Sequence, residues 1–181
     1  MFLKLPFYRN NFKLFYISSI MKYLSGKNEK IALEYMAEAA KVALNSTCHD
    51  ARCGSIIVKY GKIIGKGFNS PPGNKENQRR CDYSKDSYHK KITDKTCCVH
   101  AEERAIIDAL RNNPLKIVGS TLYFTRIDEH GNLLRRLGAP YCTICSKMAL
   151  DVGIEEFVLY HLDGISIYNT DEYNLISFNY R

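Results

Sequence analysis

The sequence predicts an α/β fold in which a mixed β-sheet is covered on its faces by helices. Segments with helical periodicity alternate with short β-rich segments along the chain, and this order implies crossover connections. The chain has 181 residues, the usual length of one domain, and 45% of them are hydrophobic against 25% charged, which excludes a disordered or collagen-like protein. We therefore expect a single domain over residues 26–181.

Residues 1–25 are expected to form an N-terminal extension, either disordered or upstream of the true start. Residues 1–20 contain three basic residues, no acidic residue and many aromatic and aliphatic side chains without clean helical spacing. A membrane-surface segment, or sequence upstream of a start at Met21, fits this composition better than a targeting peptide, which should be richer in Ser and Arg. No apolar run reaches the length of about 18 residues that a membrane span requires.

The first half of the domain should contain a helix, a hairpin and a long loop. A helix is predicted over residues 28–45, where apolar residues recur near a period of 3.6. Residues 54–58 and 62–68 are β-rich and separated by a tight turn, so they should form a hairpin. Residues 69–97 follow as a polar loop, and a loop of this length in a compact domain usually has a function.

The second half continues the alternation. The predicted elements are a helix over residues 101–111, a strand over 121–125, a helix over 143–152 and a strand over 156–161. The tail is less regular, and Thr170 is a candidate cap for a short helix over 171–175.

The charge balance favours an anionic partner. Lys and Arg number 26 against 19 Asp and Glu, a formal net charge of +7, although a Lys-rich surface can also simply solvate the fold. In the loop after the hairpin, Arg79 and Arg80 are candidates for binding a phosphate group. The loop lacks the interleaved aromatic residues of a single-strand binding groove, so a phosphorylated small molecule is favoured over nucleic acid.

The cysteines indicate a metal site rather than disulfides. The chain has seven, which is an odd number; Cys97 and Cys98 are adjacent, and Cys142 and Cys145 have the spacing of metal ligands. This pattern fits a disulfide framework poorly, so we expect a reducing compartment, the cytoplasm.

Two motifs at predicted helix starts carry the chemistry: His100-Ala101-Glu102 and Cys142-Thr143-Ile144-Cys145. His100, Cys142 and Cys145 can supply three ligands to zinc and leave a fourth position for water, as in catalytic zinc sites. Helix N-termini favour the thiolate form that binds metal. Glu102 is placed to relay the proton of a water whose pKa zinc lowers to about 7.

Each motif alone has a simpler explanation. A Glu in a first helical turn often only compensates the helix dipole, and a C-x-x-C pair can be a redox pair or half of a structural site. The two motifs together, each at a helix start with a strand between them, are difficult to obtain by chance.

The combination resembles the zinc-dependent cytidine and deoxycytidylate deaminase superfamily, whose signature is H-x-E and P-C-x-x-C. Ser46-Thr47-Cys48, the segment from Gly54 to Val58 and Gly67-Phe68-Asn69 are similar to the deoxycytidylate deaminase branch. The resemblance implies a three-layer α-β-α sandwich with a mixed five-stranded sheet, zinc held by His100, Cys142 and Cys145, and Glu102 as proton shuttle. It also implies that the substrate-binding residues include Asn69, Ala101 and Tyr141.

The sequence departs from the family pattern in two places. Tyr141 separates Pro140 from Cys142, in the segment that would line the base pocket, so the identity of the base is open. The loop region is also rich in potential ligands, and a second, structural zinc could be held by Cys48, Cys81, His89 and Cys97. The alternative for these cysteines is ordinary packing as free buried thiols.

We therefore expect a zinc-dependent hydrolase that converts deoxycytidylate (dCMP) to deoxyuridylate (dUMP) and ammonia. The alternatives are deamination of guanine, a pterin or a base in RNA or DNA, and a non-catalytic zinc-stabilised module that binds nucleic acid. Family analogy suggests a homo-oligomer.

Overall fold

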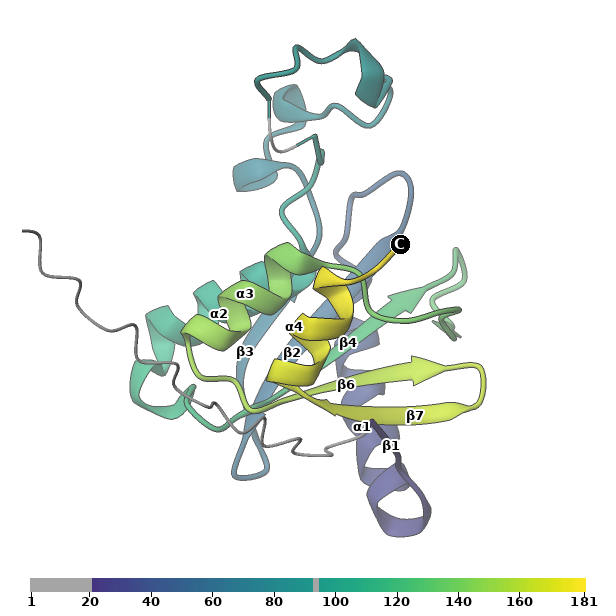
Figure 1. The fold of residues 1–181 in the computed structure, drawn as a ribbon, viewed down its shortest axis with the longest axis vertical. Coiled ribbons are helices and arrows are strands. Elements are labelled where there is room, and N and C mark those ends of the chain that lie inside the picture. Colours follow the sequence, from purple (N-terminus) through teal and green to yellow (C-terminus); the bar gives the residue numbers. More distant parts are fainter. Residues whose placement is uncertain (1–20, 93–94) are drawn as a thin grey trace, which may run out of the picture.

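The computed structural model describes residues 21–92 and 95–181, and a mixed sheet lies at its centre (Figure 1). The strand order is β1-β7-β6-β4-β2-β3, with β5 paired to β4. The strands are β1 (Lys22–Tyr23), β2 (Arg52–Lys59), β3 (Lys62–Phe68), β4 (Thr121–Ile127), β5 (Leu133–Leu134), β6 (Glu156–His161) and β7 (Gly164–Asn169). Because β4 and β6 are parallel and the other pairs antiparallel, the predicted mixed sheet is confirmed.

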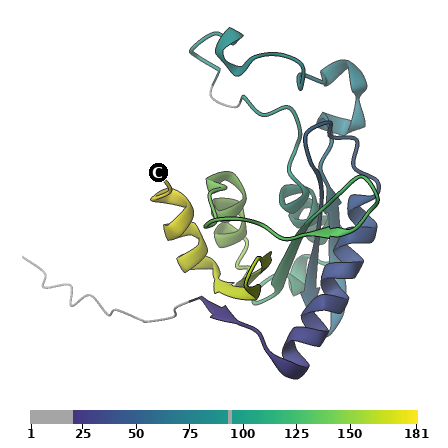
Figure 2. The same ribbon diagram turned by 90° about the vertical axis from the view of Figure 1, so that its right-hand side faces the viewer.

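Helices cover both faces of the sheet, which confirms the predicted three-layer sandwich (Figure 2). Helix α1 (Gly26–Ala43) lies on one face, and α2 (Ala101–Asn112), α3 (Thr143–Asp151) and α4 (Thr170–Phe178) lie on the other. No α-helix within the described ranges is long and apolar enough to cross a membrane.

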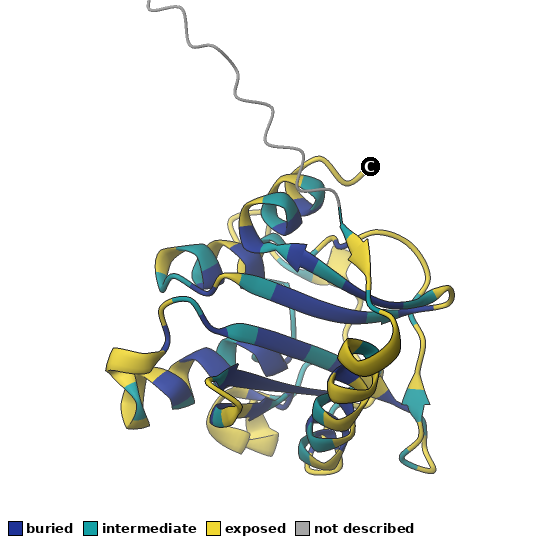
Figure 3. Cartoon of the chain, turned by 90° about the horizontal axis from the view of Figure 1, so that it is seen from below, coloured by how far each residue is buried: buried dark blue, intermediate teal, exposed yellow. Residues whose placement is uncertain are grey.

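The two faces of the sheet give the domain two cores. Successive residues of a strand point to opposite faces, so Ile56 and Val58 of β2 pack with α1, whereas Ile57 packs with α2. Buried residues accordingly follow the strands and the inner sides of the helices (Figure 3).

Glycines allow both helix layers to approach the sheet closely. A Cβ atom on Gly54 would overlap the backbone of Ala39 in α1, and one on Gly67 of β3 would overlap the carbonyl oxygen of Ala101 in α2. Because glycine has no side chain, the first turn of α2 rests directly on the backbone of β3.

The sheet has seven strands rather than the five that the resemblance implied. The difference comes from β1 and β5, which are two residues long each. A strand of two residues cannot show the alternating pattern by which strands are recognised in a sequence.

Strand β1 lies before the boundary expected at residue 26. It pairs antiparallel with β7, and the backbone N–H of Met21 donates to Oε1 of Glu172 at 2.8 Å. The segment from Met21 onward is therefore attached to the sheet. The prediction for residues 1–20 lies outside the described residues.

The C-terminal elements differ from the expectation. Strand β7 was missed, and α4 extends to Phe178 instead of ending at residue 175. The assignment of Thr170 as the helix cap is wrong, because the side chain of Asn169 accepts the hydrogen bond from the backbone N–H of Asp171, at 3.0 Å. Asn is among the residues that most favour this position.

The predicted loop after β3 is confirmed, and it rises from one end of the sheet (Figure 1). It contains the 3-10 turns Pro72–Asn74, Glu76–Gln78 and Lys85–Ser87. The backbone N–H of Val99 donates to the carbonyl oxygen of Ser70 at 3.0 Å, so the two ends of the loop meet beside the start of α2.

Candidate metal centre and its pocket

The structure brings His100, Cys142 and Cys145 together at the meeting point of two helix starts. Nδ1 of His100 lies 3.3 Å from each sulfur, and the two sulfurs lie 3.2 Å apart. His100 is the N-cap residue of α2, Cys142 is the N-cap residue of α3, and Cys145 lies in the first turn of α3. One ion could therefore contact all three ligand atoms.

The protonation pattern of the three residues suits a zinc ion. Hydrogen bonds with Cys145 and His100 lower the pKa of Cys142 to about 4, so this sulfur is already a thiolate at neutral pH. The hydrogen bond with Cys142 and burial raise the pKa of Cys145. A metal ion that binds this sulfur would therefore have to displace the proton of the Cys145 thiol. A nitrogen and two sulfurs from three protein ligands are the donor set of a zinc site with an open fourth position.

Glu103 fixes the orientation of the histidine backbone. Its Oε2 accepts a hydrogen bond from the backbone N–H of His100 at 2.8 Å, as part of a capping box. The sequence analysis did not single out Glu103, although an acid three residues after an N-cap is the signal of this motif.

Glu102 lies beside the three ligands and is 5% exposed. Burial raises its pKa to about 7, and the charge of Cys142 acts in the same direction. A carboxyl group that titrates near neutral pH can both accept and return a proton at that pH.

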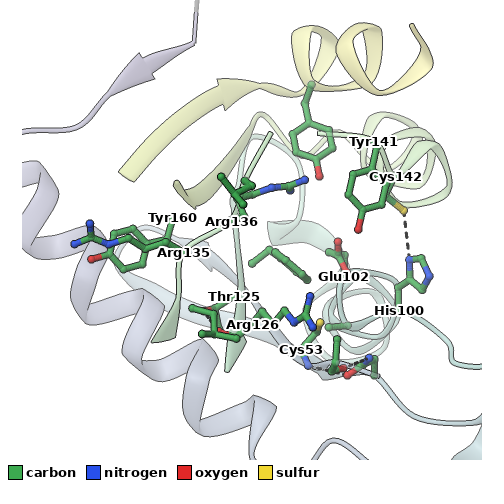
Figure 4. Close-up of a pocket in the computed structure, with 17 residues that line it drawn as sticks. Cys53, His100, Glu102, Thr125, Arg126, Arg135, Arg136, Tyr141, Cys142 and Tyr160 are labelled. Carbon is green, nitrogen blue, oxygen red and sulfur yellow. Dashed lines mark hydrogen bonds between the residues drawn. The ribbon is translucent and has the colours of Figure 1, made fainter. Parts of the chain in front are cut away.

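These residues border a cavity of about 500 Å³, which is within the usual size of a small-molecule site. Figure 4 shows Glu102, His100 and Cys142 on one side of it and three arginines on the other. The lining residues are Ala51, Cys53, Asn69, His100, Ala101, Glu102, Phe124, Thr125, Arg126, Leu134, Arg135, Arg136, Leu137, Tyr141, Cys142, Tyr160 and Tyr173.

The arginines of the pocket were missed by the sequence analysis. Arg126 ends toward the cavity from β4, and Arg135 and Arg136 belong to the segment between β5 and α3. Glu102 is the single carboxylate among the lining residues, so the pocket is electropositive. Nothing in the local sequence marks these arginines, because they reach the site from separate segments.

Asn69 lines the pocket, but most of the hydrogen-bonding capacity of its side chain is already taken by other residues of the protein. Oδ1 accepts hydrogen bonds from the backbone N–H of Cys53 at 2.8 Å and from Oγ of Ser46 at 2.7 Å. Nδ2 donates to the carbonyl oxygen of Ala51 at 2.8 Å, which leaves one N–H for a ligand.

Ala101 and Tyr141, the other two predicted substrate-binding residues, also line the pocket. Ala101 is fully buried, whereas Tyr141 is 63% exposed. The ring of Tyr141 lies 5.5 Å from that of Tyr180, between centroids, and the Arg136 guanidinium lies 5.4 Å from its centre. Tyr141 thus stands at the mouth of the cavity.

The structure does not bring Arg79 and Arg80 to this pocket. Arg79 forms an ion pair with Glu76 at 2.7 Å, and Arg80 donates to the carbonyl oxygen of Thr96 at 3.1 Å. Arg79 also donates to Oγ1 of Thr47 at 3.2 Å, so both guanidinium groups bind partners in the loop or in the segment after α1.

Three of the four predicted second-site residues lie near one another. The sulfurs of Cys81, Cys97 and Cys98 are all within 4.8 Å of one another. Burial, followed by the neighbouring Cys48 thiol, raises the pKa of Cys98. His89 does not join this group; its Nδ1 accepts a hydrogen bond from the backbone N–H of Lys91. Cys98, the neighbour of Cys97 in the sequence, stands in its place.

The layered fold and the His–Cys–Cys centre define an α/β-sandwich protein with a zinc-type site beside a buried carboxylate. The sequence profile described as "Cytidine and deoxycytidylate deaminase zinc-binding region" matches residues 29–161. The chain belongs to this family, which confirms the resemblance inferred from the sequence and supports zinc as its metal.

Two curated relatives and one solved structure that are similar to this chain are deoxycytidylate deaminases. The chain is 29% identical over 144 residues to the deoxycytidylate deaminase of Schizosaccharomyces pombe, covering 77% of this chain and 38% of that protein. It is 25% identical over 130 residues to the deoxycytidylate deaminase of Mycobacterium phage D29, covering 68% and 89%. The dCMP deaminase of cyanophage S-TIM5, solved in complex with dCMP and dUMP, superposes with a TM-score of 0.50 at 25% identity and covers 71% of this chain and 79% of that one.

The lengths of these relatives differ. The chain spans less than half the length of the two yeast relatives, 38% for Schizosaccharomyces pombe and 44% for Saccharomyces cerevisiae. The matched family region also ends at residue 161, so β7 and α4 lie beyond it.

Proposed function

We propose that this protein catalyses the hydrolytic deamination of dCMP to dUMP and ammonia. The observation that carries the proposal is the buried carboxyl of Glu102, whose pKa is raised to about 7, next to three converging zinc-type ligands in an arginine-lined cavity. A structural metal site has no use for such a carboxyl.

Each residue of the centre has a role in this proposal. His100, Cys142 and Cys145 would hold the zinc ion, which when bound supplies a Lewis acid and lowers the pKa of water to about 7. Glu102 accepts a proton from the attacking water and passes it to N3 of the base; it then accepts the proton of the new C4 hydroxyl and passes it to the departing amino group. The C4–O bond forms, the C4–N bond breaks, and ammonia leaves.

The arginines support a phosphorylated substrate. In Figure 4 the side chains of Arg126 and Arg136 extend toward the space in front of Glu102, whereas Arg135 lies against Tyr160. Guanidinium groups bind phosphate with several donors at once. We therefore assign the 5′-phosphate to this side of the pocket and no longer to Arg79 and Arg80. The names of the relatives favour the deoxyribose form and the cytosine base.

We further propose a second, structural zinc at Cys48, Cys81, Cys97 and Cys98. Four thiols are a complete ligand set for a tetrahedral structural site. These residues come from the segment after α1, from the middle of the long loop and from its C-terminal end, so a shared ion would explain how a polar loop without a core of its own is held. His89 is not part of this set.

An assay of ammonia release tests the reaction. The zinc-loaded full chain would be incubated with dCMP, deoxycytidine, cytidine, guanine and a short single-stranded oligonucleotide, with the Glu102→Gln variant as control. Ammonia from dCMP in preference to the others is expected. If ammonia were released only from one of the other compounds, that compound would be the substrate in place of dCMP. Salt-dependent oligonucleotide binding without release from any of them would support the binding module. A homo-oligomeric state and a cytoplasmic location remain predictions from the sequence.

A further inference from the structure

Tyr173 lines the pocket although it lies outside the family region. The matched residues end at 161, and Tyr173 belongs to the C-terminal helix α4. Its ring therefore adds to the cavity a group that the family match does not assign.

The ring of Tyr173 is held in one orientation by other aromatic rings. It stacks on Phe157 with centroids 4.0 Å apart and meets Tyr168 edge-on at 5.9 Å. The hydroxyl of Tyr168 in turn contacts Nε2 of His161 at 2.9 Å. Tyr173 is 2% exposed, so neither the ring nor its hydroxyl has much freedom to move.

The hydroxyl of Tyr173 has no hydrogen-bond partner among the described residues, whereas that of Tyr168 has one. The hydroxyl oxygen is not among the enclosed polar atoms that lack a partner, so it is open to the cavity that this side chain lines. A bound ligand can therefore provide the hydrogen-bond partner.

Arg136 brings a free positive charge to the same side of the cavity. Its backbone N–H donates to the carbonyl oxygen of Tyr160 at 2.8 Å, which attaches it to β6. Its guanidinium donates to the carbonyl oxygen of Ala139 at 3.0 Å and has no carboxylate partner within the described ranges. A guanidinium has five N–H donors, so most of them remain available.

The two groups border the same cavity, and Figure 4 shows the side chain of Arg136 extending into it. One ligand in this cavity can therefore contact both groups. A hydroxyl donor beside an unpaired guanidinium is complementary to an anionic oxygen. Hydrogen bonds to such charged acceptors are roughly twice as strong as those between neutral groups.

We propose that the Tyr173 hydroxyl and the Arg136 guanidinium together bind the 5′-phosphate, and that Tyr173 is thereby a residue that selects nucleotide over nucleoside. This inference rests on the proposed function for the identity of the ligand. It predicts that the selectivity of the site depends on the C-terminal helix as well as on the family region.

Binding of the reaction product tests this without requiring turnover. Calorimetry on the zinc-loaded full chain would compare dUMP with deoxyuridine for the native protein, Tyr173→Phe, Arg136→Gln and the double variant. We expect Tyr173→Phe to weaken dUMP binding by about tenfold and deoxyuridine binding by less than about twofold, because only the phosphate loses a hydrogen bond. The double variant should lose less than the product of the two single losses, since both groups hold one phosphate.

Tyr168→Phe is the matched control. It removes a hydroxyl from the same aromatic cluster but not from the pocket lining, so the ratio of dUMP to deoxyuridine affinity should stay within about twofold of the native ratio. The proposal is overturned if Tyr173→Phe weakens both ligands equally, weakens neither, or combines with Arg136→Gln in a fully multiplicative way.

Failure of the proposed function has a different signature. A native protein that prefers dUMP to deoxyuridine but releases no ammonia from dCMP would contradict the deaminase reaction and leave the phosphate assignment standing. If the native protein bound both ligands equally, the phosphate assignment itself would be refuted.

Discussion

Oδ1 of Asn69 accepts a hydrogen bond from the backbone N–H of Cys53 at 2.8 Å. This bond joins the residue after β3 to the beginning of strand β2 on the wall of the pocket. Ser46 donates to the same oxygen. Asn69 therefore shapes the pocket wall with three of its hydrogen bonds before any substrate is present.

Replacing Asn69 with Ala should destabilise the fold as well as impair catalysis. The N–H of Cys53 and the carbonyl of Ala51 would lose their partner, which costs about 1–3 kcal/mol of unfolding free energy. Urea unfolding measures this loss. Asn112→Ala, at an exposed site that contacts Asp108, is the control and should change the unfolding free energy by less than about 0.5 kcal/mol. Native stability in Asn69→Ala would contradict the structural role.

Glu102→Gln should retain the metal and the fold but lose turnover. An amide of the same shape leaves the three ligands unchanged and cannot accept or return a proton, so kcat should fall at least about 100-fold. Steady-state ammonia release and zinc analysis measure the two effects. Asp108→Asn, on the exposed side of the same helix, should keep native turnover. A decrease below about tenfold in Glu102→Gln would remove this residue from the mechanism.

The metal content should reveal two separate sites. Native protein should contain about two zinc ions per chain, and Cys142→Ala should contain about one and have no activity. Cys97→Ser should also lose about one ion but retain the active-site metal, because the two clusters share no ligand. Elemental analysis with an activity assay distinguishes these cases. An unchanged zinc content in Cys97→Ser would show that the cysteine cluster holds no metal.

The arginines of the pocket, and not those of the loop, should govern the KM for dCMP. Arg126→Gln removes a charge that faces the cavity and should raise this KM about tenfold, with deoxycytidine little affected. The double variant with Gln at Arg79 and Arg80 removes charges already engaged with Glu76 and Thr96, so its KM should stay within about twofold of native. If the double variant raised the KM for dCMP more than Arg126→Gln did, the phosphate would have to be assigned to the loop.

His161 should make the fold less stable in mild acid. Burial lowers its pKa from 6.5, and the charge of Arg136 acts in the same direction, opposed by Asp163. The unfolded chain therefore takes up the proton first, and the unfolding free energy decreases as pH falls through 6.5 and levels off below the folded pKa. Urea unfolding at several pH values would follow this, with His161→Gln as the comparison, since Gln can still form a hydrogen bond with the Tyr168 hydroxyl. Identical pH profiles for the two proteins would contradict the assignment.

The sequence was sufficient to predict that His100, Cys142 and Cys145 come together, because these residues lie in short motifs at helix starts. His100 and Glu102 are fixed relative to each other by one helical turn, and so are Cys142 and Cys145. Periodicity likewise identified the four longer strands before β7 and the three helices before α4, with ends within a few residues.

The arginine-lined side of the pocket, to which we assign the phosphate, could not be predicted in this way. Arg126, Arg136 and Tyr173 come from a strand, a connection and the C-terminal helix, and only the packing of these elements brings them to one cavity. Conversely, Arg79 and Arg80 looked suitable by charge, but local pairing in the loop engages them. A sequence shows which side chains are positively charged, but not which of them reach the pocket in the folded protein.

Gly67 is not among the residues that line the pocket, yet the carbonyl of Ala101 rests against it. A methyl group at this position would push the first turn of α2 outward, carrying His100 and Glu102 with it, while the two cysteines on α3 stayed behind. The centre would separate into two halves, one on each helix, although none of its own residues had changed. An inactive variant of this protein thus need not have lost any chemical group; misalignment of two rigid bodies by the width of one methyl group would be enough.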